Sequence, residues 1–250
     1  MNVVGTLIEA LGSSRQRVRT GAEGPHAYAS EAGACVRQVA LSILTDRAEG
    51  DPDLRSEVTF RIGRDLEAAV LRAIELQVPA VQFQVPWIDG LVAGIADALY
   101  TEEGLRWVVE VKTCSFNSYQ SVIRNGPRRE HTLQAALSAR ALGGHMLHII
   151  YVCKNAPAEV APVMEFHLEV PWAEAAVAHE GLSFAVRQAQ AHVIPAPMWN
   201  GRVIQSPDLP DSWPCRYCPF ADVCRALGPG DVPVTGIQAV VDEAPARALQ

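Results

Sequence analysis

The apolar residues between positions 56 and 153 change their spacing twice, and this change constrains the fold more than any other feature. Helical spacing over 56–77 gives way to a period of two from Val81 to Val85, as in a half-buried strand. The patterns predict a helix over 56–77, strands over 81–85, 91–100 and 105–113, a helix over 130–142 and a strand over 146–153. This order predicts an α/β protein with a mixed central sheet.

Further segments are predicted at both ends of this succession. A helix is expected over 28–44, a strand over 163–170 and a helix over 172–192. At 250 residues the chain is long enough to bury a full apolar core. We therefore expect one domain over residues 1–227, with its core at about 56–170. Residues 228–250 are rich in glycine, proline, aspartate and alanine, and we expect them to form a loose tail.

Composition predicts a globular protein of the cytoplasm. Hydrophobic residues make up 49% of the chain, but the longest apolar runs, such as residues 146–153, are too short to span a bilayer. The first residues lack a basic region followed by an apolar stretch, so we expect no secretory signal. In a reducing compartment the six cysteines are metal ligands or core residues rather than disulfides. The net charge of −7 argues against non-specific coating of nucleic acid.

Two carboxylates and a lysine lie on neighbouring predicted strands. Glu110 and Lys112 are two residues apart, so their side chains share one face of a strand. If the preceding turn is centred on Glu103 and Gly104, Asp97 lies directly opposite Glu110. Like charges in opposed positions, with Cβ atoms about 5 Å apart, destabilise a strand pair. A divalent cation such as Mg²⁺ or Mn²⁺ would compensate, whereas the alternative is a pair of exposed hairpin carboxylates.

Two residues on predicted helices extend this group. Glu67 lies beside the apolar face of the helix over 56–77, where its charge needs a partner: a metal ion or an arginine. Gln134 lies on the helix after the strands, on the side that carries Leu133 and Leu137. Taken alone, Gln134 is also explained as an ordinary polar residue of a helix.

Three cysteines near the C-terminus have the spacing of a metal site. Cys215, Cys218 and Cys224 form C-x2-C-x5-C, and their thiolates could bind zinc or an iron–sulfur cluster. Cys114 and Cys153 adjoin apolar strands and resemble core residues, so Cys35, at the start of a helix, is the expected fourth ligand. The cluster-binding parts would then be residues 28–45 and 213–226. The alternative is a C-x2-C redox pair with unrelated cysteines.

One basic segment follows the third strand. It contains Arg124, Arg128 and Arg129, which are expected to lie in a loop, and is followed by His131 at the start of the helix expected over 130–142. A loop in this place, next to the carboxylates, would contact the phosphates of a nucleic acid. The alternative is a solvated loop with no ligand.

These residues together resemble the PD-(D/E)XK nuclease superfamily, in particular the RecB-like exonucleases that include CRISPR-associated iron–sulfur nucleases and their phage relatives. The resemblance spans about residues 30–224. It rests on residues 94–97 (Gly-Ile-Ala-Asp), residues 110–112 (Glu-Val-Lys), Gln134 in residues 131–134, and Cys35 in Cys-Val-Arg. Glu67 stands where many members carry a histidine ligand, a position at which some relatives use glutamate.

The resemblance implies a restriction-endonuclease-like core, in which helices flank the mixed sheet, and a cluster that joins the N-terminal helix to the C-terminal segment. It further implies that Glu67, Asp97 and Glu110 bind Mg²⁺ or Mn²⁺, that Lys112 and Gln134 complete the catalytic site, and that the four cysteines hold a 4Fe-4S cluster, with zinc as the other occupant.

The expected function is metal-dependent exonuclease digestion of DNA, single-stranded or at duplex ends, in recombination, repair or phage replication. Two alternatives stay open. One is a CRISPR-adaptation trimming nuclease or an endonuclease with the same site. The other is a non-catalytic nucleic-acid-binding module with a structural cluster. A homo-oligomer is compatible with either.

Overall fold

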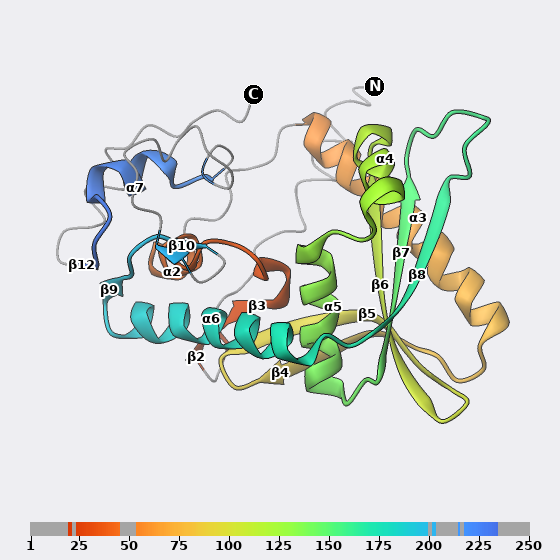
Figure 1. The fold of residues 1–250 in the computed structure, drawn as a ribbon, viewed down its shortest axis with the longest axis horizontal. Coiled ribbons are helices and arrows are strands. Elements are labelled where there is room, and N and C mark those ends of the chain that lie inside the picture. The colour runs from red at the N-terminus through yellow and green to blue at the C-terminus, as the bar shows by residue number, and fades with distance from the viewer. Residues whose placement is uncertain are drawn as a thin grey trace, which may run out of the picture.

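A twisted mixed sheet forms the centre of the computed structural model, which describes residues 20–21, 24–45, 54–199, 202–203, 215 and 218–234. Its strands run in the order β3–β5–β6–β7–β8, and β4 pairs with the other edge of β5. The strands are β3 (Ala27–Tyr28), β4 (Gln82–Asp89), β5 (Val92–Glu102), β6 (Leu105–Cys114), β7 (Met146–Cys153) and β8 (Val163–Glu169). Only β3–β5 and β6–β7 are parallel pairs. The expected mixed sheet is confirmed (Figure 1).

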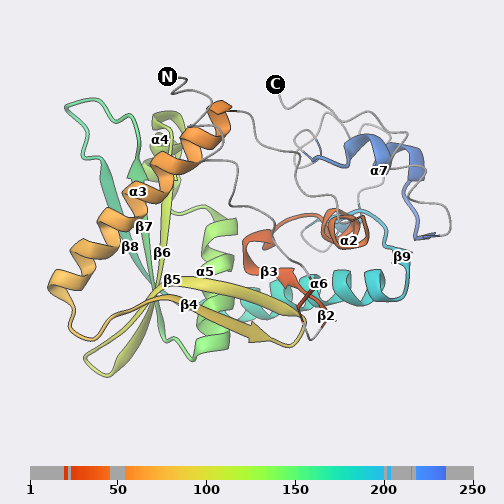
Figure 2. The ribbon, with the colours of Figure 1, turned by 180° about the vertical axis from the view of Figure 1, so that it is seen from behind.

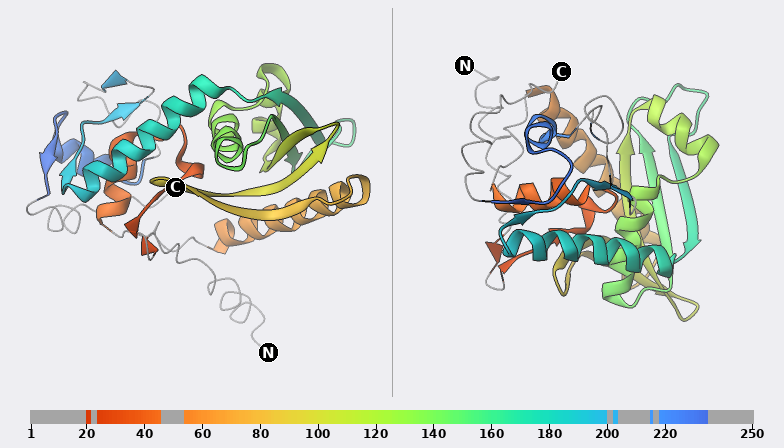
Figure 3. Two further views of the ribbon diagram at one scale, coloured as in Figure 1. Left: turned by 90° about the horizontal axis from the view of Figure 1, so that it is seen from below. Right: turned by 60° about the vertical axis from the view of Figure 1, so that its left-hand side comes forward.

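Helices cover both faces of this sheet. On one face lies α3 (Leu54–Gln77), whose Ile74 is buried against side chains of β5, β6 and β7. On the other lie α4 (Phe116–Asn125) and α5 (Arg129–Leu142). Ala135, Ala136 and Ala139 of α5 are fully buried, and these small side chains let the helix approach the sheet closely. Figures 2 and 3 show the resulting layers, with α3 separated from α5 by the strands.

The β5–β6 hairpin has the predicted register. Its turn residues, Glu103 and Gly104, both have positive φ, at 51° and 79°. Such turns match the right-handed twist of the flanking strands. Ala98 pairs with Val109, which is the register that places Asp97 opposite Glu110. The regular pairing of β5 with β6 ends at Ala98–Val109, and at its first two residues β5 pairs with β3 instead. The two strands thus separate at the carboxylates.

Described segments from the N-terminal and C-terminal parts of the chain form a second packed region, seen on the left of Figure 1. It contains α2 (Val36–Leu44), α7 (Ala221–Leu227), and the short pair of β9 (Val193–Ile194) with β12 (Val232–Pro233). Leu41, Ile194, Phe220 and Val223 are buried together here. The long helix α6 (Trp172–Gln190) packs against both α2 and α5, and so links this region to the sheet. Three further elements are short: β1 (Thr20–Gly21) with β2 (Gly24–Pro25), the 3-10 helix η1 (Ala29–Glu31), and β10 (Met198–Trp199) with β11 (Arg202–Val203).

Two expectations about local structure were wrong. The helix expected over 28–44 begins only at Val36, because residues 27–28 join the sheet and Gly33 has a φ of 84°. The basic segment is not one loop. Arg124 lies in α4, which the sequence did not predict, and Arg129 begins α5; His131 lies in α5, as the helix expected over 130–142 requires. Residues 126–128 alone connect the two helices.

The first residues of the segment expected to be a loose tail belong to the folded structure. Residues 228–234 are packed against the rest of the protein, because β12 pairs with β9 and Gly228 and Gly230 accept hydrogen bonds from Arg37. Residues 235–250 lie outside the described part. Within that part, no helix has the length and apolar character needed to cross a membrane.

Candidate active site and cysteine site

Where β5 and β6 separate, the Asp97 carboxylate accepts a hydrogen bond from a backbone N–H of β6. The Val111 N–H donates to Asp97 Oδ2 at 2.7 Å. The Asp97 side chain therefore satisfies the Val111 N–H, which has no partner in the β5–β6 pairing. This bond fixes the Asp97 carboxylate beside the segment Glu110–Lys112, as the register predicted.

Glu110 is the most deeply buried charged group of the site, at 1% exposure. Its Oε1 forms an ion pair with Lys112 Nζ. Its Oε2 is buried and has no hydrogen-bond partner among the residues that the structure describes. An unsatisfied buried oxygen costs about 1–3 kcal/mol, and more when it is charged. A bound cation would remove this cost, so the residues present fit a metal ion.

Glu67 approaches the same site from α3. Its Oε1 accepts a hydrogen bond from Gln84 Nε2 at 3.2 Å. Gln84 has a φ of 48° and lies on β4 between the pairs Phe83–Ala98 and Val85–Ala96, which places it across from Asp97. The side-chain oxygens of Glu67, Asp97 and Glu110 do not all lie within 4.8 Å of one another. The three carboxylates thus lie near enough for their charges to interact, but they are not gathered as tightly as the ligands of one ion.

Electrostatics show that this region is short of positive charge. Burial raises the pKa of Asp97 to about 8, and the charges of Glu110 and Glu67 contribute to this rise. Burial also raises the pKa of Glu110, against the opposing effect of Lys112. Protons or a cation must therefore compensate the carboxylates at neutral pH.

Lys112 is held in place by two neighbours. Its Nζ donates to Gln134 Oε1 at 3.0 Å and pairs with Glu110 on its own strand. Gln134 reaches it from α5, which packs on this face of the sheet. The structure thus brings Asp97, Glu110, Lys112 and Gln134 into one constellation. Sequence reasoning missed Gln84, whose alternation with the apolar residues of β4 indicated only a strand.

The four expected nucleic-acid contacts have different environments. Arg129 pairs with Glu174 at 3.5 Å, and Arg124 Nε donates to its own helix at Gln120. His131 Nδ1 lies 2.7 Å from the Tyr151 hydroxyl, to which the Arg128 N–H also donates. Burial and the charges of Lys112 and Arg128 lower the pKa of His131 to about 3.

His131 is therefore neutral at physiological pH and contributes no positive charge. The buried Tyr151 was missed by sequence reasoning. Its position on β7, in phase with Ile149, indicated only a core residue.

The four predicted cysteines converge although they lie far apart in the sequence. Cys35 caps the start of α2, Cys224 lies in α7, and Cys215 and Cys218 precede that helix. All four line one cavity, together with apolar residues such as Leu41 and Phe220. Cys114 and Cys153 lie elsewhere, as adjacent partners on β6 and β7, in agreement with their interpretation as core residues.

Thiolates in this cavity need a counter-charge. Burial and the charges of the other three thiols raise the pKa of Cys218 to about 12. A metal ion or cluster would hold such thiols in the deprotonated form. Four thiols in a largely apolar cavity are a donor set suited to zinc or an iron–sulfur cluster, although no three of these described thiols lie within 4.8 Å of one another.

Arg37 is a further residue of this site. It is 1% exposed, and its guanidinium donates to the carbonyls of Pro195, Gly228 and Gly230 and to Cys224 Sγ at 3.4 Å. Within the described residues these partners include no carboxylate. Arg37 therefore places a buried positive charge in contact with one of the four cysteines.

Comparison with known proteins supports the fold. No protein-family model matches the chain, and no curated protein matches it in sequence. Among solved structures, SSO0001 aligns with a TM-score of 0.55 at 14% identity, over 90% of this chain and 97% of that one. An alkaline exonuclease (LHK-Exo) from Laribacter hongkongensis aligns with a TM-score of 0.52 at 13% identity, over 73% of this chain and 93% of its own. The same enzyme in complex with dAMP aligns with a TM-score of 0.52 at 15% identity, over 69% and 90%. The chain therefore shares its fold with these solved structures.

Proposed function

We propose that this protein is a metal-dependent deoxyribonuclease that digests DNA from its ends. The observation that carries the proposal is the buried Glu110 Oε2, which lacks a hydrogen-bond partner among the described residues and lies beside Asp97 and Lys112. The same constellation lies on a fold shared with an alkaline exonuclease. An acidic site with one lysine fits a reaction in which negative charge develops on a phosphate.

Each residue has a separate role in this proposal. Asp97 and Glu110, together with Glu67 of α3, would hold Mg²⁺ or Mn²⁺. When bound, such an ion polarises the phosphate and lowers the pKa of a bound water molecule. Lys112 would orient the attacking water and stabilise the negative charge of the phosphate. Gln134 is a positioning residue, because its Oε1 accepts a hydrogen bond from Lys112 Nζ.

The DNA would approach from the α4–α5 side of the site. Arg128 lies in the connection between these helices. Its positive charge, like that of Lys112, helps to lower the pKa of His131. This places one cationic side chain near the constellation. Arg124 is exposed on the preceding helix and would extend the track along the phosphates.

The cysteine site has a structural role in this proposal. Cys35, Cys215, Cys218 and Cys224 would hold a 4Fe-4S cluster, or zinc as the other occupant. Either would fasten α2 to the C-terminal segment, since metal–thiolate bonds contribute directly to folding. Arg37 would balance part of the negative charge of the thiolates.

The test is hydrolysis of end-labelled linear duplex DNA by Lys112→Ala. We expect the rate to fall by about 100-fold or more, because a charge that stabilises the transition state is lost. Lys154→Ala, which removes another lysine at the end of the neighbouring strand, is the matched control and should keep nearly the full rate. An unchanged rate in Lys112→Ala would overturn the proposed site. Equal cleavage of closed circular DNA would instead favour an endonuclease.

A further inference from the structure

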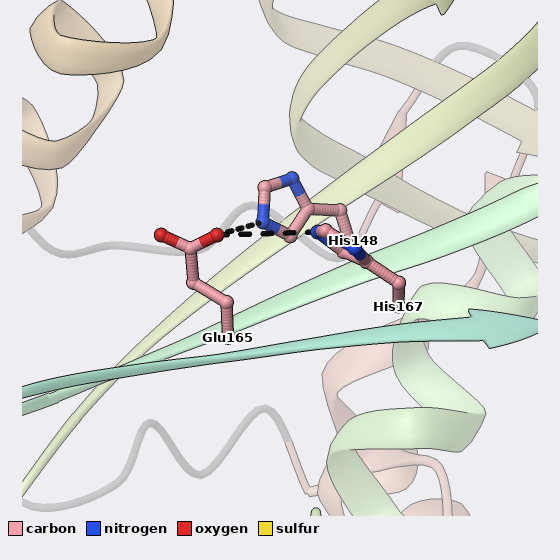
Figure 4. A group of neighbouring side chains, drawn as sticks. All are labelled: His148, Glu165 and His167. Atoms are coloured by element: carbon pink, nitrogen blue, oxygen red, sulfur yellow. Dashed lines mark hydrogen bonds and ion pairs between the residues drawn. The ribbon is translucent and has the colours of Figure 1, made fainter.

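A second group of potential ligands lies on β7 and β8. His148 and His167 are directly opposed in the antiparallel pairing of these strands. Glu165 precedes His167 by two residues, so its side chain emerges on the same face. Figure 4 shows the three side chains pointing toward one another above the two strands.

The ligand atoms of the three residues are close enough to share one ion. His148 Nε2 lies 3.2 Å from Glu165 Oε2, and His167 Nε2 lies 3.9 Å from the same oxygen. One ligand atom from each residue lies within 4.8 Å of the other two. Among the described residues this is the one group of three that meets this distance.

Aromatic residues hold the two imidazoles in this arrangement. The Tyr100 hydroxyl lies 3.3 Å from His148 Nδ1, which leaves Nε2 directed at Glu165. A metal-binding histidine commonly uses its second ring nitrogen in a hydrogen bond of this kind, which fixes the orientation of the ring. The Trp107 ring meets His167 edge to face at 5.3 Å and stacks on Tyr100. The group is therefore supported by packed residues of β5 and β6.

This group is distinct from the carboxylate site. His148 shares its strand face with Ile150 and Val152, which pack in the core under α3. Glu110 and Lys112 alternate with Val109 and Val111 of that same core, so they face the opposite side, where Lys112 meets α5. An ion bound by the histidines would not share ligands with an ion at Asp97 and Glu110.

We propose that His148, Glu165 and His167 form a zinc-binding site. Two imidazoles and one carboxylate are a donor set that favours Zn²⁺ over Mg²⁺. Glu165 and His167 are about half exposed, so a fourth position is open to water. Because β8 is the edge strand of the sheet, the ion would fasten this strand to β7 by side chains from both.

The experiment measures Zn²⁺ binding to the full chain by isothermal titration, with the cysteine site loaded and with excess Mg²⁺ present. The variants are His167→Gln and Glu165→Gln. Both positions are exposed, and glutamine can keep the hydrogen bond to His148 while it removes the carboxylate. His192→Asn, an exposed histidine at the end of α6, is the matched control.

We expect the wild type and His192→Asn to bind one more equivalent of Zn²⁺ than His167→Gln. Glu165→Gln should bind this equivalent at least about tenfold more weakly, and Tyr100→Phe about tenfold more weakly. Equal stoichiometry and affinity in the wild type, His167→Gln and Glu165→Gln would overturn the site. The result does not depend on nuclease activity, so it stands apart from the proposed function.

Discussion

Asp97→Asn should stabilise the protein in the absence of divalent metal, and the gain should grow with pH. Asparagine keeps an oxygen that can accept the Val111 N–H, but it cannot ionise. In the wild type, burial and the neighbouring carboxylates raise the pKa of Asp97 from 3.8 to about 8. The folded protein therefore holds a proton over a pH range in which the unfolded chain has lost it.

The sign and size of the effect follow from this difference. Below pH 4 aspartate is protonated in both states, so the variant gains nothing there. As pH rises toward 8, the wild type loses stability, because folding must retain a proton or bury a charge. Each pKa unit corresponds to about 1.4 kcal/mol, so the variant should be more stable by about 6 kcal/mol above pH 8.

Urea unfolding at pH 4 and pH 8, without divalent metal, measures this difference. Glu102→Gln, which removes an exposed carboxylate at the end of the same strand, is the control, and its stability–pH curve should run parallel to that of the wild type. Addition of Mg²⁺ at pH 8 should stabilise the wild type and leave Asp97→Asn nearly unchanged. Parallel stability–pH curves for the wild type and Asp97→Asn would refute the reasoning.

Three other substitutions test the remaining parts of the structure. Cys218→Ala should lower bound iron or zinc and soluble yield, because metal binding contributes to folding; metal analysis of protein purified without oxygen checks this, and unchanged content would remove Cys218 from the site. Arg37→Leu should cost about 3 kcal/mol or more in urea unfolding, since it leaves three carbonyls without their donor. The exposed Arg187→Leu is its control, and equal losses would contradict the role of Arg37. Gly94→Ala places a Cβ 2.5 Å from the Trp87 ring, so the ring must move at a cost of about 1–3 kcal/mol. Gly181→Ala in α6, where a Cβ meets nothing within 4 Å, should not destabilise, and an unchanged thermal midpoint in Gly94→Ala would show that the ring is not confined.

Local patterns were sufficient where a segment carries its own periodicity. The helix α3, the strands β5 to β7 and the helix α5 lie close to their expected positions, because each has a regular apolar face. The register of β5 with β6 also followed from sequence, since a two-residue turn at Glu103–Gly104 allows one alignment. That alignment was enough to predict Asp97 beside Glu110.

Local patterns failed where neighbours decide the structure. The helix α4 is ten residues long and has only Tyr119 and Val122 buried, and it was not predicted because the basic residues at its end were interpreted as a loop. Residues 228–234 were predicted to be part of a loose tail because their composition is typical of a loop. They are packed because β9 and Arg37, which lie far away in the sequence, supply their hydrogen-bond partners.

The sequence by itself determined the order of the elements, the pairing of the two acidic strands and the C-x2-C-x5-C spacing of Cys215, Cys218 and Cys224, because spacing encodes these within one segment or one turn. Only the tertiary structure decided what surrounds each group. It brought Gln134 to Lys112, buried Glu110, placed Arg37 against Cys224, and joined His148 to Glu165 and His167. These contacts join residues that are distant in sequence. Their chemistry depends on burial and distance, which arise only when the helices and strands pack.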